Sequence, residues 1–169
     1  MVEKIVDIRA IESREINIEE ELFDMGEETA AIIDESMGNA AKKSLAIHRN
    51  LNHAEVNLDR YYFKQIVENL FSNAIKFSPE GRNIYVSTGQ RNGKAQLNIR
   101  DEGPGFTVED KKRMFGKYQK LSAKPTGGES STGIGLSIVK KYVDAMGGTI
   151  YCDSFPGKGA TFKVEFNNK

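Results

Sequence analysis

The chain has 169 residues, of which 38% are hydrophobic and 28% are charged. This size and composition predict one globular domain and exclude a disordered tail, a collagen-like repeat and a disulfide scaffold. No apolar run approaches the ~20 residues of a membrane-spanning helix. The single cysteine, Cys152, permits no internal disulfide or zinc cluster, so the chain suits a reducing cytoplasm.

Charge is unevenly distributed along the chain, although the formal net charge is zero. Residues 1–58 carry 6 basic and 13 acidic side chains, whereas residues 59–169 carry 18 basic and 11 acidic side chains. We therefore expect an anionic ligand to bind in the second part.

Hydrophobic periodicity predicts a mixed order of helices and strands in the first part of the chain. In chain order we expect the end of a helix over 1–11 that begins outside the sequence, a strand over 15–24, a helix over 27–42, and short strands over 44–50 and 54–59. The first 13 residues then form the remnant of a preceding helix, and residues 14–169 form one domain.

The second part predicts a helix, two hairpins and a long loop. Asp59 caps a strongly periodic helix that ends at Ser78-Pro79-Glu80-Gly81. A hairpin with Asn92-Gly93 at its turn follows, and its second strand ends at Asp101. Residues 103–132 show little periodicity apart from a short helix around 108–115, which is typical of a functional lid. A helix that opens at Gly133-Ile134-Gly135 and a hairpin over 149–155 and 160–166 close the domain.

Polar side chains recur on one stripe of the helix after Asp59. Asn69, Asn73 and Lys76 are spaced i, i+4 and i+7, so they share one face. Amide oxygens can coordinate Mg²⁺, and an ammonium can meet phosphate as a point charge. A solvated helix face has the same pattern, so the stripe alone leaves both interpretations open.

A carboxylate precedes closely spaced glycines in Asp101-Glu102-Gly103-Pro104-Gly105. Glycines allow the backbone to approach a ligand. An ionised carboxylate only accepts hydrogen bonds, so Asp101 suits the amino group of adenine and disfavours the carbonyl of guanine. An ordinary turn also explains such a string.

A glycine-rich segment leads from Gly127 into the helix that contains Leu136. Unpaired N–H groups at a helix start can bind phosphate, and the segment lacks the Gly-Lys-Ser/Thr of a P-loop. The preceding lid is basic, which suits either phosphate binding or solubility. We expect the lid to be mobile without nucleotide, with Met114, Phe115, Tyr118 and Leu121 as its apolar contacts.

With these motifs in this order, residues 14–167 resemble the ATP-binding catalytic domain of two-component sensor histidine kinases, in the superfamily shared with gyrase and the heat-shock chaperone. The matching motifs are NLFSNAIKF (69–77), DEGPG (101–105), MFGKYQKL (114–121), STGIGL (131–136) and GKGATF (157–162). The resemblance implies an α+β fold of the Bergerat type. In this two-layer α/β sandwich, about three helices pack on one face of a mixed sheet, and a long ATP lid is attached.

The resemblance also implies roles for individual residues. Asn73 would be the Mg²⁺ ligand and Asn69 its support, while Lys76 would contact phosphate and Phe77 the adenosine. Asp101 would read adenine from a turn made by Gly103 and Gly105, with Thr161 holding a water beside it. The remaining predicted nucleotide contacts are Lys120, Gly133, Ile134, Gly135 and Leu136. Lys120 stands where many relatives carry Arg, and a lysine lacks the bidentate fork of an arginine.

The implied reaction is Mg²⁺-assisted transfer of the ATP γ-phosphoryl group to a histidine on a dimerisation domain, with Asn69, Lys76 and Lys120 as catalytic residues. The helix remnant at 1–13 resembles the tail of that acceptor domain, and His48 and His53 are expected to be structural or surface residues. The isolated chain should therefore be nearly inactive.

Expected partners are ATP or ADP, the dimerisation domain and a response regulator, without nucleic acid or membrane contact. Two alternatives remain open, a nucleotide-gated switch without kinase activity and an anti-sigma-type serine kinase.

Overall fold

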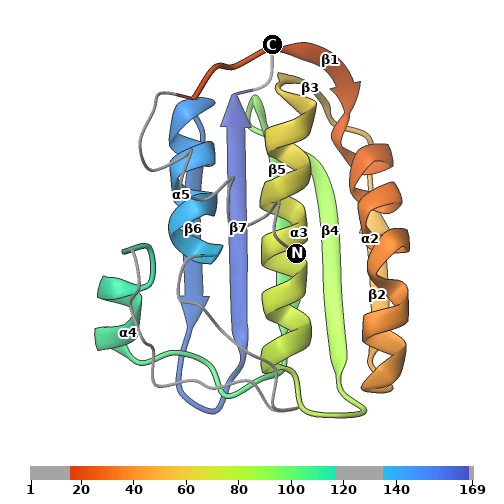
Figure 1. Cartoon of the computed structure of the whole chain (residues 1–169), viewed down its shortest axis with the longest axis vertical. Coiled ribbons are helices and arrows are strands. Elements are labelled where there is room, and N and C mark those ends of the chain that lie inside the picture. Colours follow the sequence, from red (N-terminus) through yellow and green to blue (C-terminus); the bar gives the residue numbers. More distant parts are fainter. Residues whose placement is uncertain (1–15, 117–134, 168–169) are drawn as a thin grey trace, which may run out of the picture.

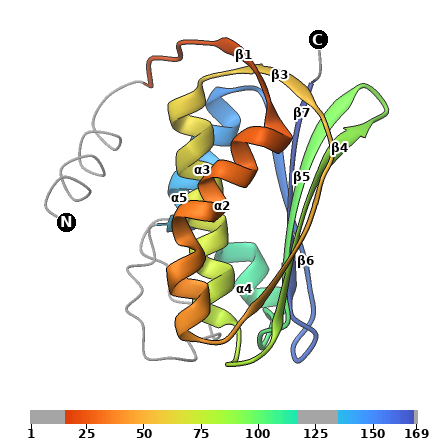
Figure 2. The same ribbon diagram turned by 90° about the vertical axis from the view of Figure 1, so that its right-hand side faces the viewer.

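A five-stranded mixed sheet with helices on one face forms the body of the chain (Figures 1 and 2). This computed structural model describes residues 16–116 and 135–167. The strand order is β2-β4-β5-β7-β6, and β1 and β3 form a separate two-stranded sheet. The strands are β1 Glu21–Asp24, β2 Ala46–Leu51, β3 Glu55–Leu58, β4 Asn83–Arg91, β5 Lys94–Asp101, β6 Thr149–Ser154 and β7 Ala160–Asn167.

The sheet is mixed because its edge strand β2 pairs with β4 in parallel, while all the other pairs are antiparallel. Strand β3 and helix α3 lie between β2 and β4 in the chain, and this connection supplies the crossover that a parallel pair needs. The last strand, β7, lies between β5 and β6. Asp101, the last residue of β5, is therefore paired with Ala160, the first residue of β7.

Three helices cover the sheet, and a short fourth helix, α4, lies at its lower end (Figures 1 and 2). Their bounds are α2 Met25–Lys42, α3 Arg60–Phe77, α4 Val108–Arg113 and α5 Gly135–Ala145. The carboxylate of Asp24 accepts from the first amides of α2, and that of Asp59 accepts from the first amides of α3. A capping box between Thr107 and Asp110 opens α4.

The core lies between the helices and the sheet. The apolar stripe of α3, predicted from its periodicity, is buried, and alternate residues of the central strands face it. Among the largest fully buried side chains are Phe63, Phe71, Ile84, Leu97, Ile99, Tyr142 and Phe166. Within the described residues, no element covers the opposite face of the sheet (Figure 2). None of the described helices has both the length and the apolar character that a bilayer crossing requires.

The observed architecture confirms the predicted α+β fold with helices on one face of a mixed sheet. Two boundaries differ from the sequence predictions. Strand β1 begins at Glu21 rather than near residue 15, because its partner β3 ends at Leu58, where the chain turns into the cap of α3. Helix α2 begins at Met25 rather than 27, because Asp24 already accepts hydrogen bonds from Gly26 and Glu27. The predicted helix end over 1–11 lies outside the described residues.

Candidate functional site

The C-terminal half of α3 carries the predicted polar stripe, and all four of its predicted site residues are half-buried. These are Asn69, Asn73, Lys76 and Phe77. The Asn69 amide nitrogen donates to the carbonyl of Gln65 at 2.7 Å. A Cβ on Gly135 would lie 3.3 Å from the Asn69 Oδ1. The first residue of α5 therefore abuts the stripe, and Leu136 beside it is buried.

Asp101 is a buried carboxylate at the end of β5, with 5% of its surface exposed. Its Oδ1 accepts a hydrogen bond from the Gly103 amide at 2.8 Å. Burial raises the pKa of Asp101 to about 6, although the Gly103 and Ala160 amides act in the opposite direction. The group is therefore mostly ionised at neutral pH and able only to accept hydrogen bonds.

The loop after Asp101 lies directly against the end of α3. A Cβ at Gly103 would collide with the carbonyl oxygen of Phe77, so this position requires glycine. The ring of Phe77 meets the ring of Phe106 edge to face at 5.9 Å between centroids, and Phe106 in turn meets Phe162 of β7. Side chains from α3, the 101–106 loop and β7 are thereby held together.

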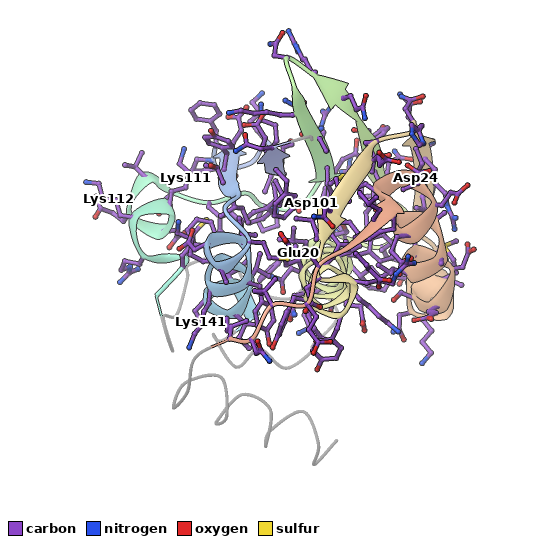
Figure 3. The ribbon with its side chains drawn as sticks, turned by 90° about the horizontal axis from the view of Figure 1, so that it is seen from above. Glu20, Asp24, Asp101, Lys111, Lys112 and Lys141 are labelled. Carbon is purple, nitrogen blue, oxygen red and sulfur yellow. The ribbon has the colours of Figure 1, made fainter. Side chains whose placement is uncertain are left out.

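The β6–β7 hairpin fixes this loop through a serine that sequence reasoning missed. The buried Ser154 hydroxyl accepts from the Phe106 amide at 2.8 Å and donates to the Gly159 carbonyl at 2.6 Å. Its own carbonyl accepts from the Lys111 ammonium of α4 at 2.8 Å, and Lys111 also lies over the Phe155 ring. No pattern in the sequence distinguishes Ser154 from other serines at strand ends. Figure 3 labels Asp101 near the middle of the molecule and Lys111 on α4 at its edge.

Thr161 does not lie beside Asp101. In the β5–β7 pairing, Ala160 is opposite Asp101 and Thr161 is opposite Arg100. Successive residues of a strand face opposite sides, and Phe162 points to the helices, so Thr161 faces the uncovered side of the sheet. The predicted role of Thr161 is therefore inconsistent with this register, and the backbone of Ala160 takes its place near Asp101.

Several residues predicted for the site and the lid lie outside the part of the chain that the structure describes. Lys120, Gly133 and Ile134 lie outside the described residues, as do the predicted lid contacts Tyr118 and Leu121. Met114 is buried and Phe115 packs against the core, as predicted.

The two histidines lie on a strand and in a loop, as predicted. His48 in β2 stacks on Tyr85 at 4.8 Å between ring centroids, and its Nε2 is 2.8 Å from the Asn83 side-chain oxygen. His53 lies 3.2 Å from the Asp24 carboxylate. The described part of the chain contains no cluster of three His, Cys, Asp or Glu side chains that could hold a metal ion.

Comparison with known proteins places this arrangement in a family. Residues 58–169 match the family described as "Histidine kinase-, DNA gyrase B-, and HSP90-like ATPase". The chain belongs to this family. The matched region includes α3, the Asp101 loop, α5 and the β6–β7 hairpin, which together form the site described above.

Similar members of the family include sensor histidine kinases. The chain is 31% identical over 169 residues to the sensor histidine kinase TmoS of Ectopseudomonas mendocina, covering 97% of this chain but 17% of TmoS. The mycobacterial sensor histidine kinase MprB has the same fold, with a TM-score of 0.78 at 23% identity over 89% of this chain and 99% of the MprB chain. The histidine kinase ThkA, solved in complex with the response regulator TrrA, matches with a TM-score of 0.80 at 23% identity, over 99% of this chain and 47% of the ThkA chain.

Proposed function

We propose that this chain is the catalytic domain of a sensor histidine kinase, which transfers the γ-phosphoryl group of ATP to a histidine on a separate helical dimerisation domain. The observation that carries the proposal is that three sequence motifs lie side by side along the C-terminal half of α3. Gly135 abuts Asn69, and Gly103 abuts Phe77 while donating to the buried Asp101. Membership of an ATPase family and similarity to sensor kinases such as TmoS support it.

Asp101 would select the base. A buried carboxylate that is ionised at neutral pH accepts a hydrogen bond from the amino group of adenine and repels the carbonyl of guanine at the same place. Gly103 and Gly105 would let the backbone approach the base, and the Phe77 ring would contact the adenosine. The edge-to-face contact of Phe77 with the buried Phe106 would hold the Phe77 ring in place for this contact.

The polar stripe of α3 fits a Mg²⁺ ion held mainly by phosphate. Asn73 would supply an amide oxygen to the metal, and Asn69 would support it, because amide oxygens are hard ligands of the kind Mg²⁺ prefers. Such an ion would neutralise charge on the transferring phosphoryl group. Lys76 would bind phosphate as a point charge, together with the amides around Gly135 at the start of α5.

Phosphoryl transfer depends mostly on positioning and charge neutralisation, so the acceptor must be held in place by its own domain. Lys120, Gly133 and Ile134 complete the proposed set of phosphate contacts by their sequence positions. A response regulator would receive the phosphoryl group next, and the solved complex of ThkA with TrrA supports this kind of partner. We infer a cytoplasmic reaction, where ATP is available.

Incubation with γ-labelled ATP and Mg²⁺ tests the proposal, with and without the histidine-bearing dimerisation domain of the full-length protein. We expect acid-labile label on the added domain. Asn73→Ala should reduce the label, and EDTA should weaken nucleotide binding far more in the wild type than in this variant. Nucleotide binding without transfer would favour a switch domain, and acid-stable label on a serine would favour an anti-sigma-type kinase. Either result would contradict the proposal.

A further inference from the structure

The ammonium group of Lys43 lies against the last turn of α3. Lys43 is the residue that follows α2, and its Nζ is 2.7 Å from the carbonyl oxygen of Ile75 and 3.2 Å from that of Lys76. Its own carbonyl accepts from the amide of Gly81 at 2.9 Å. One residue thus contacts both the end of α3 and the loop that follows it.

The end of α3 needs such a donor because of its sequence. In a continuing helix, the carbonyl of Ile75 would accept from the amide of residue 79, but residue 79 is proline and has no N–H. The carbonyl of Lys76 would need an amide beyond the helix end. An ammonium bound to both oxygens satisfies these acceptors and opposes the negative end of the helix dipole.

This turn also carries two of the proposed nucleotide contacts. It contains Lys76 and Phe77, and the carbonyl of Phe77 lies against Gly103. Gly103 in turn donates to the Asp101 carboxylate. A shift of the last turn would therefore move a proposed phosphate contact and the support of Asp101 together.

We infer that Lys43 is a positioning residue for the nucleotide site, which acts by holding the last turn of α3 from the end of α2. The inference rests on the proposed function, since it assumes that this turn binds nucleotide. Lys43 acts through the backbone of α3 and makes no contact with nucleotide itself. Removing the Lys43 ammonium should therefore weaken nucleotide binding more than a substitution elsewhere that lowers the stability of the whole fold by a similar amount.

The test compares Lys43→Met, which keeps the apolar stem and removes the donors, with Lys43→Arg, which keeps a charged donor. Titration calorimetry with Mg-ADP, well below the unfolding temperature, should show about tenfold weaker binding for Lys43→Met and a return to near wild-type affinity for Lys43→Arg. Hydrogen exchange should be faster in Lys43→Met at the Ser78 amide, which bonds to Ala74 in this turn.

Two matched controls separate positioning from stability. Lys42→Met removes the exposed neighbouring lysine and should change neither affinity nor exchange. Asp24→Ala removes the cap at the other end of α2, so it should lower the unfolding temperature while leaving the affinity for Mg-ADP unchanged.

The outcomes distinguish the inference from the proposed function. If the wild type does not bind Mg-ADP, the proposed function is wrong and the inference fails with it. If the wild type binds but Lys43→Met binds equally well, or Asp24→Ala weakens binding as much, only the inference is wrong. A failure of Lys43→Arg to restore affinity would likewise overturn the inference alone.

Discussion

Asp101 has two properties that oppose each other. The proposed adenine recognition requires a charged acceptor, whereas burial penalises that charge and raises the pKa of Asp101 to about 6. A carboxyl whose pKa is higher in the folded chain than its ordinary value of 3.8 favours folding while it is protonated. This contribution is complete below about pH 4 and is lost as the pH rises through about 6.

Asp101→Asn should remove this pH dependence. We expect the free energy of unfolding of the variant to approach that of the wild type near pH 4 and to exceed it by about 2–3 kcal/mol at pH 7. Urea unfolding at several pH values measures the difference. Parallel pH profiles for the two proteins would contradict the expectation.

The same substitution should weaken binding of Mg-ADP at pH 7, because the variant loses a charge-assisted bond to the adenine amino group. The wild type should prefer ATP to GTP. Equal affinity of the wild type for both nucleotides would contradict the role of Asp101.

At the scale of elements, the end of α2 stores backbone strain. Ser44, just after the helix, has a φ of 54°, in the left-handed region that costs most residues roughly 1–2 kcal/mol. Ser44→Gly should therefore raise the free energy of unfolding by about 1 kcal/mol, measured in urea. Asn92 in the β4–β5 turn also has a φ of 54°, but asparagine tolerates this conformation better, so Asn92→Gly should stabilise less.

The substitution Ser154→Ala should remove the hydrogen bond that connects the β6–β7 hairpin to the 101–106 loop. The substitution leaves the buried Phe106 amide and the Gly159 carbonyl without the hydroxyl, so we expect a loss of about 1–3 kcal/mol in the free energy of unfolding. The affinity for Mg-ADP should also fall, because this loop directly follows Asp101 and its Gly103 amide donates to the Asp101 carboxylate. The matched change Ser72→Ala, at an exposed position on α3, should leave the free energy of unfolding almost unchanged. An equal loss in both variants would show that the Ser154 hydroxyl does not stabilise the loop.

Helices and turns of this chain were largely predictable because their signals are local. Asp59, the apolar stripe of α3 and the Asn92-Gly93 turn each act within a few residues. Strand boundaries were less predictable, since β1 begins where its partner permits. The motifs on α3 and around Asp101 predicted that these residues lie at one site, a role that stays a prediction. The side of the sheet that Thr161 faces depends instead on the pairing register. A shift of one residue in the pairing of β7 with β5 would turn Thr161 to the other side of the sheet, and no local sequence pattern determines this register.

At the scale of the whole molecule, the sheet separates the proposed nucleotide site from His48. The site lies on the helical side of the sheet, whereas His48 stacks on Tyr85, a partly exposed residue of the uncovered face. His53 lies beside the first residues of α2, at the opposite end of the helical layer from the last turn of α3 (Figure 1).

The isolated chain should therefore not phosphorylate either histidine. Incubation with γ-labelled ATP should leave it without acid-labile label, and the double variant His48→Gln/His53→Gln should still support labelling of an added dimerisation domain. Label on the isolated wild type that disappears in the double variant would overturn this expectation.

The position of β7 has a consequence for the order in which the chain becomes functional. This last strand fits between β5 and β6, and it supplies the Ala160 partner of Asp101. During synthesis, β7 must leave the ribosome before the central sheet can close and bury Asp101. A nascent chain that ends before β7 therefore has an open gap in its sheet, and the proposed adenine site around Asp101 is incomplete. Nucleotide can stabilise only the completed fold, so ATP should act late in folding, after the most distant strand has paired.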